Sequence, residues 1–426
     1  MMKIKLAYIF IFFFTSLVYS QQNIVADLKV KGNKKTKLSF VKKISTIKAG
    51  DKLDSLILEQ DIKRLQRLPS VGHAYYQVFH SHDNEYNVFY NIEENFTIVP
   101  SLNVYTSTND EFAFRAGVYE FNSLGRNITF GGFYQQDIYG SYAVNFRAPY
   151  LFSSKLGLAF NYQNLTTQEP VFFPNTSNVN YKYNNESYET LGLYEINFKN
   201  RIEAGVNFFT EDYLFKSGEG VENIPEDKLS LVTKKVLYKF IYEYNNLDFY
   251  YQYISGFKSM LNVQYVKNRE GVDLPDFLIW WNDFFYFKRI GEKGNWANRL
   301  RVGLASNNDS PFAPFSVDNN LNVRGVGNII DRGTGVIVLN TEYRYTLHDK
   351  KWLIVQGNAF VDAGSWRNPG GDFGDFSNSQ NIRVYPGLGV RFTHKKIFNA
   401  TFRIDYGYGI TKDAARGLVF GIGQYF

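Results

Sequence analysis

Arg324 is the side chain with the clearest chemical role that this sequence suggests. It lies between Val323 and Gly325, inside a long segment, residues 309–334, that separates two stretches patterned like strands. Loops of this length without structure of their own are usually functional. Gly325 and the glycines near it tolerate positive φ, so the loop can fold sharply back on itself. We therefore expect the loop to bring Arg324 to a partner elsewhere in the chain.

Asp362 is the predicted partner of Arg324. On its predicted strand, Gln356 and Asn358 have the same parity as Asp362, so one face of the strand is polar. Asp405, on a later predicted strand, could share the arginine. A charge that is removed from water needs a partner, and deleting one member of a buried pair costs on the order of 3–5 kcal/mol. The sequence thus predicts a loop lock made of Arg324, Gly325, Asp362 and Asp405.

The residues that enzymes commonly use are poorly arranged. The chain has five histidines and no cysteine, which excludes disulfides, thiol nucleophiles and thiolate metal sites. No histidine accompanies a candidate nucleophilic serine, as a hydrolase would require. His80 and His82 share one face of a strand and could bind a metal, but two ligands do not make a site. We predict no catalytic residues, no metal and no cofactor.

Residues 1–20 have the pattern of a secretory signal peptide: Lys3 and Lys5 precede an apolar stretch, residues 6–14, and small or modest residues end at Ser20. The alternative is a retained anchor, but the apolar stretch is shorter than the roughly 20 residues of a membrane span. The formal charge is +6, and removal of the two lysines leaves 45 − 41 = +4. A charge this small does not indicate nucleic-acid binding.

Residues 21–95 read as one small α+β domain. Its predicted order is β-α-α-β-β, with helices near residues 36–45 and 54–67 and strands at residues 24–30, 72–79 and 86–92. Asp54 is placed to cap the second helix.

From residue 96 onward the pattern changes to apolar and polar residues in alternation, interrupted by Gly, Asn and Asp. Glu203, Glu342 and Arg403 each lie on such a polar face. Alternation alone fits both a soluble sandwich and an outer-membrane barrel, whose polar face lines the lumen. The export signal and an aromatic content of 18% favour the barrel. We predict a mainly β fold: a transmembrane antiparallel β-barrel over residues 96–426.

The spacing of the alternating stretches predicts about sixteen strands, eleven before the long loop and five after it. An even number is usual for bacterial single-chain barrels. Short turns are expected at residues 121–126, 148–153, 347–350 and 393–396, and long loops at residues 166–186, 216–228, 309–334 and 365–381. Short connections at one end and long ones at the other are typical of outer-membrane barrels.

Several motifs together resemble the BamA/TamA outer-membrane insertase superfamily, of the bacterial surface antigen type. These are the Val-Arg-Gly loop at residues 323–325, the Phe-Val-Asp-Ala-Gly strand at residues 360–364 and the last strand at residues 418–426. The domain at residues 21–95 resembles a single POTRA module. POTRA modules offer sheet edges to incoming chains.

The resemblance implies an outer-membrane protein assembly or translocation factor with its N-terminal domain in the periplasm. Its expected partners are unfolded outer-membrane or secreted proteins, outer-membrane lipid and other assembly-machinery subunits. The alternatives are a passive pore or scaffold, a lipid-transfer barrel, and a POTRA-like domain that serves only as a spacer.

A lateral seam is expected where the first barrel strand meets the last. Pro100 lacks an N–H, and proline within sheets is confined to edges, strand starts and bulges. Gly417, Gly421 and Gly423 bring no side chain to pack, and Phe426 ends the predicted strand. In lipid, an incoming strand could replace a lost backbone hydrogen bond there. The alternative is that Pro100 only marks the start of its strand.

Overall fold

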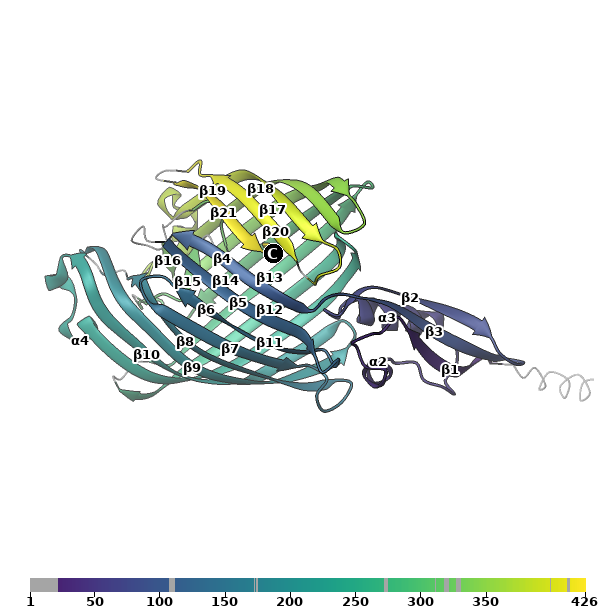
Figure 1. Ribbon diagram of the computed structural model, residues 1–426. Helices are drawn as coiled ribbons and strands as arrows, with labels where there is room; N and C mark the ends of the chain where they lie inside the picture. Colours follow the sequence, from purple (N-terminus) through teal and green to yellow (C-terminus); the bar gives the residue numbers. More distant parts are fainter. Residues whose placement is uncertain are drawn as a thin grey trace, which may run out of the picture.

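The computed structural model describes residues 22–426 except 107–111, 172, 174, 272–274, 311, 318–321, 327–330, 399 and 412–413. A small α+β domain lies against one end of a large barrel (Figure 1). Within the described residues, no helix is both long and apolar enough to cross a membrane. The signal peptide predicted for residues 1–20 lies outside the described part of the chain.

The N-terminal domain has the predicted β-α-α-β-β order. Asp54 caps the second helix, because its carboxylate accepts a hydrogen bond from the N–H of Leu56. The strand order is β1-β3-β2, so β3 is central, and β1 is parallel to it while β2 is antiparallel. The elements are β1 (Ile24–Lys31), α2 (Leu38–Ile44), α3 (Ser55–Gln66), β2 (Val71–His80) and β3 (Glu85–Glu94).

The barrel is one antiparallel sheet of sixteen strands, which confirms the predicted fold class. Eleven strands precede the long loop: β4 (Ile98–Thr106), β5 (Phe112–Ser123), β6 (Ile128–Gln136), β7 (Gly140–Ala148), β8 (Leu156–Pro170), β9 (Ser177–Asn197), β10 (Asn200–Glu219), β11 (Ser230–Tyr250), β12 (Tyr253–Gly271), β13 (Phe277–Ile290) and β14 (Gly294–Ala305). Five follow it: β17 (Gly335–Asp349), β18 (Leu353–Arg367), β19 (Ile382–His394), β20 (Thr401–Tyr408) and β21 (Arg416–Ile422). Short helical turns occur in the connections: η2 (Val221–Asn223), α4 (Glu226–Leu229), η3 (Phe373–Ser377) and η4 (Ser379–Asn381).

One of the predicted long loops is wrong, because much of its sequence is strand. Residues 166–186 are largely taken up by the end of β8 and the start of β9. The loop predicted at residues 216–228 is present between β10, which continues to Glu219, and β11, which begins at Ser230. These strands project past the end of the barrel that is distant from the N-terminal domain (Figure 1). Their backbone groups pair with one another along the extension. Backbone pairing therefore keeps Asn- and Tyr-rich sequence in strands where composition indicates loops.

The two faces of the barrel differ in polarity, as a membrane barrel requires. Large apolar side chains on the outer face are exposed, including Phe130, Tyr142, Phe160, Tyr188, Phe240, Leu300, Leu339, Phe402 and Phe420. Charged side chains on the inner face are buried, including Glu189, Asp283, Arg299, Glu342, Arg344, Arg391 and Asp405.

The long loop between β14 and β17 folds into the lumen. Two short strands, β15 (Phe315–Val317) and β16 (Asp331–Gly333), pair within it. Val323 and Val326 are fully buried and belong to a cluster that includes Val336 and Val338 of β17. Of the predicted loop motif, residues 322–326 are described, and the rest of residues 319–328 lies outside the described part. Apolar packing thus fixes the loop tip against the barrel wall.

Candidate functional site

Arg324 and Asp362 meet inside the barrel, and neither side chain is exposed. Arg324 donates three hydrogen bonds to this carboxylate: from its backbone N–H to Oδ2 at 2.9 Å, from Nε to Oδ2 at 2.7 Å and from Nη2 to Oδ1 at 2.9 Å. The two side-chain bonds form the bidentate arrangement that suits a planar guanidinium. The loop arginine is therefore held by both its backbone and its side chain.

Two further carboxylates surround the same guanidinium. Arg324 Nη1 donates to Glu342 Oε2 at 2.7 Å and lies 3.7 Å from Asp405 Oδ2. Asp362 is on β18, Glu342 on β17 and Asp405 on β20. Three wall strands thus converge on one loop side chain, and Asp405 contributes the longest of the three contacts.

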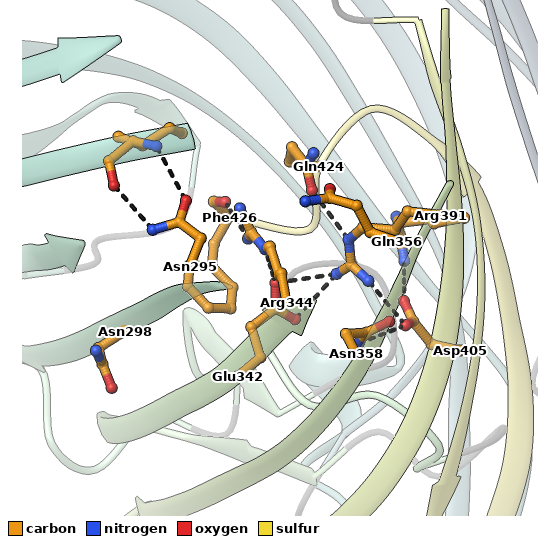
Figure 2. Close-up of polar contacts among 12 residues, drawn as sticks. Asn295, Asn298, Glu342, Arg344, Gln356, Asn358, Arg391, Asp405, Gln424 and Phe426 are labelled. Carbon is orange, nitrogen blue, oxygen red and sulfur yellow. Dashed lines mark hydrogen bonds and ion pairs between the residues drawn. The ribbon is translucent and has the colours of Figure 1, made fainter. Parts of the chain in front are cut away.

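Three more arginines complete this cluster. Arg391 Nη2 donates to both oxygens of Glu342, at 3.0 and 2.9 Å, and its Nη1 donates to Asp405 Oδ1 at 3.3 Å. Arg344 Nε also donates to Glu342, and Arg403 Nη1 lies 3.5 Å from Asp405 Oδ2. Figure 2 shows Arg344 and Arg391 pointing toward Glu342.

The cluster holds four guanidiniums (Arg324, Arg344, Arg391, Arg403) and three carboxylates (Glu342, Asp362, Asp405), so its formal charge is 4 − 3 = +1. Each of these side chains is at most 9% exposed. Buried charges are expensive unless they are paired and hydrogen-bonded. The network therefore ties the loop to four wall strands. Removal of a carboxylate, or of Arg324 from Asp362, would leave a buried charge without its partner.

Aromatic rings also contact Arg324. Its guanidinium carbon lies 3.7 Å from the centre of the Phe360 ring and 4.6 Å from that of Tyr425. The Phe360 ring has room because residue 387 is a glycine. A Cβ at Gly387 would lie 2.2 Å from the ring. Cation–π contacts that are shielded from water contribute about 2 kcal/mol each.

Gly325 lets the loop tip approach the wall. Its φ of 92° lies in the left-handed region, and a Cβ there would lie 2.6 Å from Gly407 Cα on β20. A Cβ on Gly407 would in turn lie 2.3 Å from the Arg324 carbonyl oxygen. The loop backbone therefore lies directly against the strand backbone. Two glycines are needed at this contact.

Four members of this cluster were not predicted as site residues from the sequence: Glu342, Arg344, Arg391 and Arg403. Glu342 lies on a strand whose polar face was recognised by its alternation. Its parity indicates that it points into the lumen, but parity does not give its position along the barrel axis. In the structure it pairs across the ladder with Phe360, two residues from Asp362.

At the predicted lateral seam, β4 and β21 occupy the two ends of the sheet order and lie next to each other. Among the described residues, no ladder joins them. The Phe121 N–H donates a hydrogen bond to Thr97 O. Hydrogen-bonded and non-hydrogen-bonded pairs alternate along an antiparallel ladder, so the β4–β5 register makes Pro100 and Val118 a non-hydrogen-bonded pair. The Pro100 nitrogen consequently faces β21, where it has no proton to donate.

The end of the seam near the N-terminal domain is bridged by other residues. The Phe96 N–H donates to Lys396 O at 2.8 Å, and Phe398 N–H donates to Phe96 O at 3.0 Å. The β19–β20 turn is thus attached to the segment that leads into β4, while β21 itself is left out of this contact.

Four of the residues expected at the seam make other contacts or turns in the structure. Gly421 makes room for Arg403, because a Cβ there would lie 2.6 Å from Arg403 Nη2. Phe426 does not extend β21, so its expected place in the seam strand is wrong. β21 ends at Ile422, and Gly423, with φ of 98°, turns the following residues into the lumen. Gly417 lies beside Gly325, because a Cβ added at Gly417 would lie 3.7 Å from the Gly325 carbonyl oxygen.

The N-terminal domain docks on the turns at one end of the barrel. Tyr150, in the β7–β8 turn, joins the apolar core of that domain next to Phe40. Its hydroxyl donates to Glu195 Oε2 at 3.0 Å, and Arg64 of α3 donates to Glu195 Oε1 at 2.8 Å. Burial raises the pKa of Tyr150 to about 12. A barrel side chain therefore forms part of the core of the other domain.

Arg67, just after α3, reinforces this junction. Its guanidinium donates to the backbone oxygens of Phe198, Asn245 and Leu247, at 2.8, 3.0 and 3.2 Å, and lies 3.9 Å from the Phe198 ring centre. Burial and the nearby Arg201 lower the pKa of Arg67 to about 10. One side chain thus contacts both the β9–β10 turn and the last part of β11.

Comparison with known proteins supports the division of the chain into an N-terminal domain and a barrel. The family model for POTRA, described as surface antigen variable number repeat, matches residues 23–95. No curated protein sequence gives a significant match. Among solved structures, BamA from Haemophilus ducreyi lacking POTRA domains 1–3 is similar over 94% of this chain and 84% of its own, with 15% identity and a TM-score of 0.55.

CdiB proteins are similar to this chain as well. CdiB from Acinetobacter baumannii is matched over 95% of this chain and 74% of its own, with 14% identity and a TM-score of 0.59. CdiB from Escherichia coli is matched over 94% and 76%, with 12% identity and a TM-score of 0.59. At these identities the similarity establishes the fold: a barrel of the BamA type that carries a POTRA module.

Proposed function

We propose that this chain, which is a BamA/TamA-type barrel with one POTRA module, is an outer-membrane protein assembly or translocation factor. The POTRA module lies in the periplasm and receives unfolded envelope proteins. The barrel then inserts them into the outer membrane or exports them through it.

The observation that carries this proposal is the incomplete closure of the barrel. β4 and β21 are neighbours, yet the described residues form no ladder between them, and Pro100 removes one donor from the facing edge. Unpaired backbone groups in lipid are costly, so an incoming strand that pairs with them is favoured. A seam of this kind gives a client strand a route from the lumen or the periplasm into the membrane.

The POTRA module supports the proposal through its position. Its sheet has two edge strands, β1 and β2, and an edge offers backbone groups to an extended chain. The docking through Tyr150 and Arg67 keeps this sheet at the same end of the barrel as the periplasmic turns. A client held at the module is therefore close to the seam.

A passive pore is the second candidate, and the luminal loop argues against it. The cluster around Arg324 and the apolar contacts of Val323 and Val326 hold the loop inside the barrel. A cavity of about 830 Å³ remains between the loop and the wall strands β8–β13, lined by residues such as Tyr183, Glu211, Lys235 and Phe312. Such a cavity could admit small solutes or part of a lipid, which keeps lipid transfer as a testable alternative.

Depletion of the protein followed by quantitative outer-membrane and secreted proteomics tests the proposal. An assembly or translocation factor predicts the selective loss of a set of envelope or secreted proteins, restored by the wild-type chain. Restoration by a chain that lacks residues 23–95 would show that the module is only a spacer. An unchanged proteome with altered solute permeability or altered lipid distribution would contradict the proposal in favour of a pore or a lipid carrier.

A further inference from the structure

The lumen contains a site that holds a short segment of the chain itself. We call residues 423–426 the tail segment. At its start, Gly423 N–H still donates to Thr401 O at 2.7 Å, and the positive φ of Gly423 then directs the next three residues away from the sheet. Gln424, Tyr425 and Phe426 consequently contact the inner wall, and Figure 2 shows Gln424 near Arg391 and Phe426 near Arg344.

Each side chain of the tail segment has its own partners in this site. Gln424 Oε1 accepts a hydrogen bond from Arg391 Nε at 3.0 Å. The ring of Tyr425 is 8% exposed and lies 4.6 Å from the Arg324 guanidinium and 4.9 Å from that of Arg403. These contacts combine hydrogen bonding with cation–π attraction.

Phe426 fills an apolar part of the same site. It packs against a buried cluster formed by Leu247 of β11, Phe287 of β13 and Ala297 of β14. The Arg344 guanidinium lies 5.7 Å from its ring, and Arg344 Nη2 donates a long hydrogen bond of 3.5 Å to its carbonyl oxygen. The tail segment therefore reaches across the lumen from β20 to the opposite wall.

The wall positions this site without help from the tail segment. Arg344 and Arg391 are held by Glu342, and Arg403 is held by Asp405. Arg344 is 1% exposed, and within the part of the chain that the structure describes its Nη1 has no hydrogen-bond partner. A buried guanidinium nitrogen without a partner is costly, so a ligand that brings one more acceptor would be favoured. The excess of one positive charge in the cluster also suits an electron-rich ligand.

We propose that this site is a receptor for a short peptide segment in which a hydrogen-bond acceptor precedes two aromatic residues. The chain's own tail segment occupies it at rest, and a matching segment of a client displaces the tail segment. This inference rests on the proposed function for the identity of the client, while the site itself is defined by the contacts of residues 424–426. The tail segment thereby keeps the site closed to peptides that lack both aromatic residues.

Peptide binding to the full chain in lipid nanodiscs tests the inference. The probe is a fluorescent decapeptide with the sequence of residues 417–426, and the control peptide has serine at the positions of Tyr425 and Phe426. In the double variant Tyr425→Ser, Phe426→Ser the site is vacated. We expect the probe to bind this variant at least tenfold more tightly than it binds the wild type, and the control peptide to bind neither with comparable affinity.

The control variant is Tyr408→Ser, which removes an exposed aromatic at the far end of β20 and leaves the tail segment in place. It should bind the probe as the wild type does. Equal affinity of the probe for the wild type and the double variant would overturn the inference. So would equal affinity of the double variant for probe and control peptide, because pairing at the seam alone would not need the aromatic rings.

A second measurement keeps the inference falsifiable if the double variant does not fold. A benzophenone-bearing residue in place of Phe426 keeps an aromatic ring in the site and should crosslink to β11, β13 or β14 on illumination. Added probe should reduce this internal crosslink at least fivefold, whereas the control peptide should leave it unchanged. A crosslink that the probe does not affect would contradict displacement.

Neither measurement requires client insertion. If depletion leaves the envelope proteome unchanged but the probe displaces the tail segment, the proposed function fails and the receptor site stands. If depletion removes clients but the probe shows no preference, only the receptor site fails.

Discussion

Arg324 and Asp362 lie 38 positions apart in the sequence and share three hydrogen bonds inside the barrel. One of these bonds is donated by the Arg324 backbone N–H and the other two by its side chain. A substitution at this position therefore removes two of the three bonds. The pair fixes the tip of the luminal loop to β18, and Gly325 allows the approach. The loop lock is thus the structural centre from which the first prediction follows.

Arg324→Ala should release the loop. It removes the cation that neutralises Asp362 and contacts Glu342, and the loss of one partner of a buried pair costs on the order of 3–5 kcal/mol. We expect a lower temperature for loss of the folded barrel in heat-modifiability gels and faster proteolysis within residues 309–334. Arg126→Ala removes an exposed arginine and serves as the control. If loop protection and assembly matched those of the control, the lock would be wrong.

Tyr150→Ala should loosen the POTRA module from the barrel. The substitution removes a buried ring from the core of the module and a hydroxyl that contacts Glu195. Truncating a buried aromatic residue costs about 3 kcal/mol or more. Distances between spin labels on the module and the barrel should broaden. Phe152→Ala changes a residue of the same turn that is 62% exposed and should leave the distances narrow. Equal distributions for the two variants would show that Tyr150 does not hold the module.

Glu94 should make the module sensitive to acid. Burial raises the pKa of its carboxyl, but the hydrogen bonds from the Lys35 and Thr36 N–H groups, at 2.8 and 2.7 Å, outweigh burial and hold the pKa below its usual 4.5. A carboxyl with a lower pKa in the folded state stabilises that state above the unfolded pKa, and this contribution is lost as the pH falls through the folded pKa.

Thermal unfolding of the module between pH 7 and pH 3 measures this effect. Glu94→Gln should lower the stability at pH 7 and flatten the acid dependence below about pH 4.5, whereas the neighbouring change Glu93→Gln should retain it. An acid profile of Glu94→Gln that is indistinguishable from the wild type would count against the role of Glu94.

Use of the POTRA sheet edge by a client can be tested at β2, because β2 is an edge strand and β3 is the central strand. Proline in β3 would break the central strand and unfold the module. The Ser81 backbone N–H donates to Glu85 O, so Val78 and Val88 form a non-hydrogen-bonded pair in the β2–β3 register. The Val78 N–H therefore points away from β3, to the outer edge of β2.

Val78→Pro should therefore abolish client handling, whereas Val78→Ala, which also loses packing but keeps the N–H, should retain most of it. The measurement is growth together with envelope proteomics after replacement of the wild-type gene. Normal function of Val78→Pro would exclude use of this edge.

The sequence predicted the strand number from alternation, which the structure obeys. It predicted the Arg324–Asp362 pair from the long loop with its glycines and from the polar face on which Asp362 lies. It did not predict Glu342 as a further partner, because the register of β17 against β18 is set by the whole ladder and not by parity. The inward turn after Ile422 depends on one positive φ at Gly423, a conformation that glycine permits but does not require. The extensions of β8–β10 depend on backbone pairing with neighbouring strands, which composition does not encode.

Crosslinking of the seam tests the central claim most directly. The chain has no cysteine, so pairs can be introduced with one cysteine at Leu102 of β4 and the other at successive positions of β21. A control pair at Leu102 and Ala116 links two strands that are already joined in a ladder.

If clients pass through the seam, oxidation of a β4–β21 pair should stop the assembly or export of the client proteins that depletion identifies. Reduction should restore it, and the control pair should have no effect. Full client assembly or export by protein that is completely crosslinked between β4 and β21 would contradict the account.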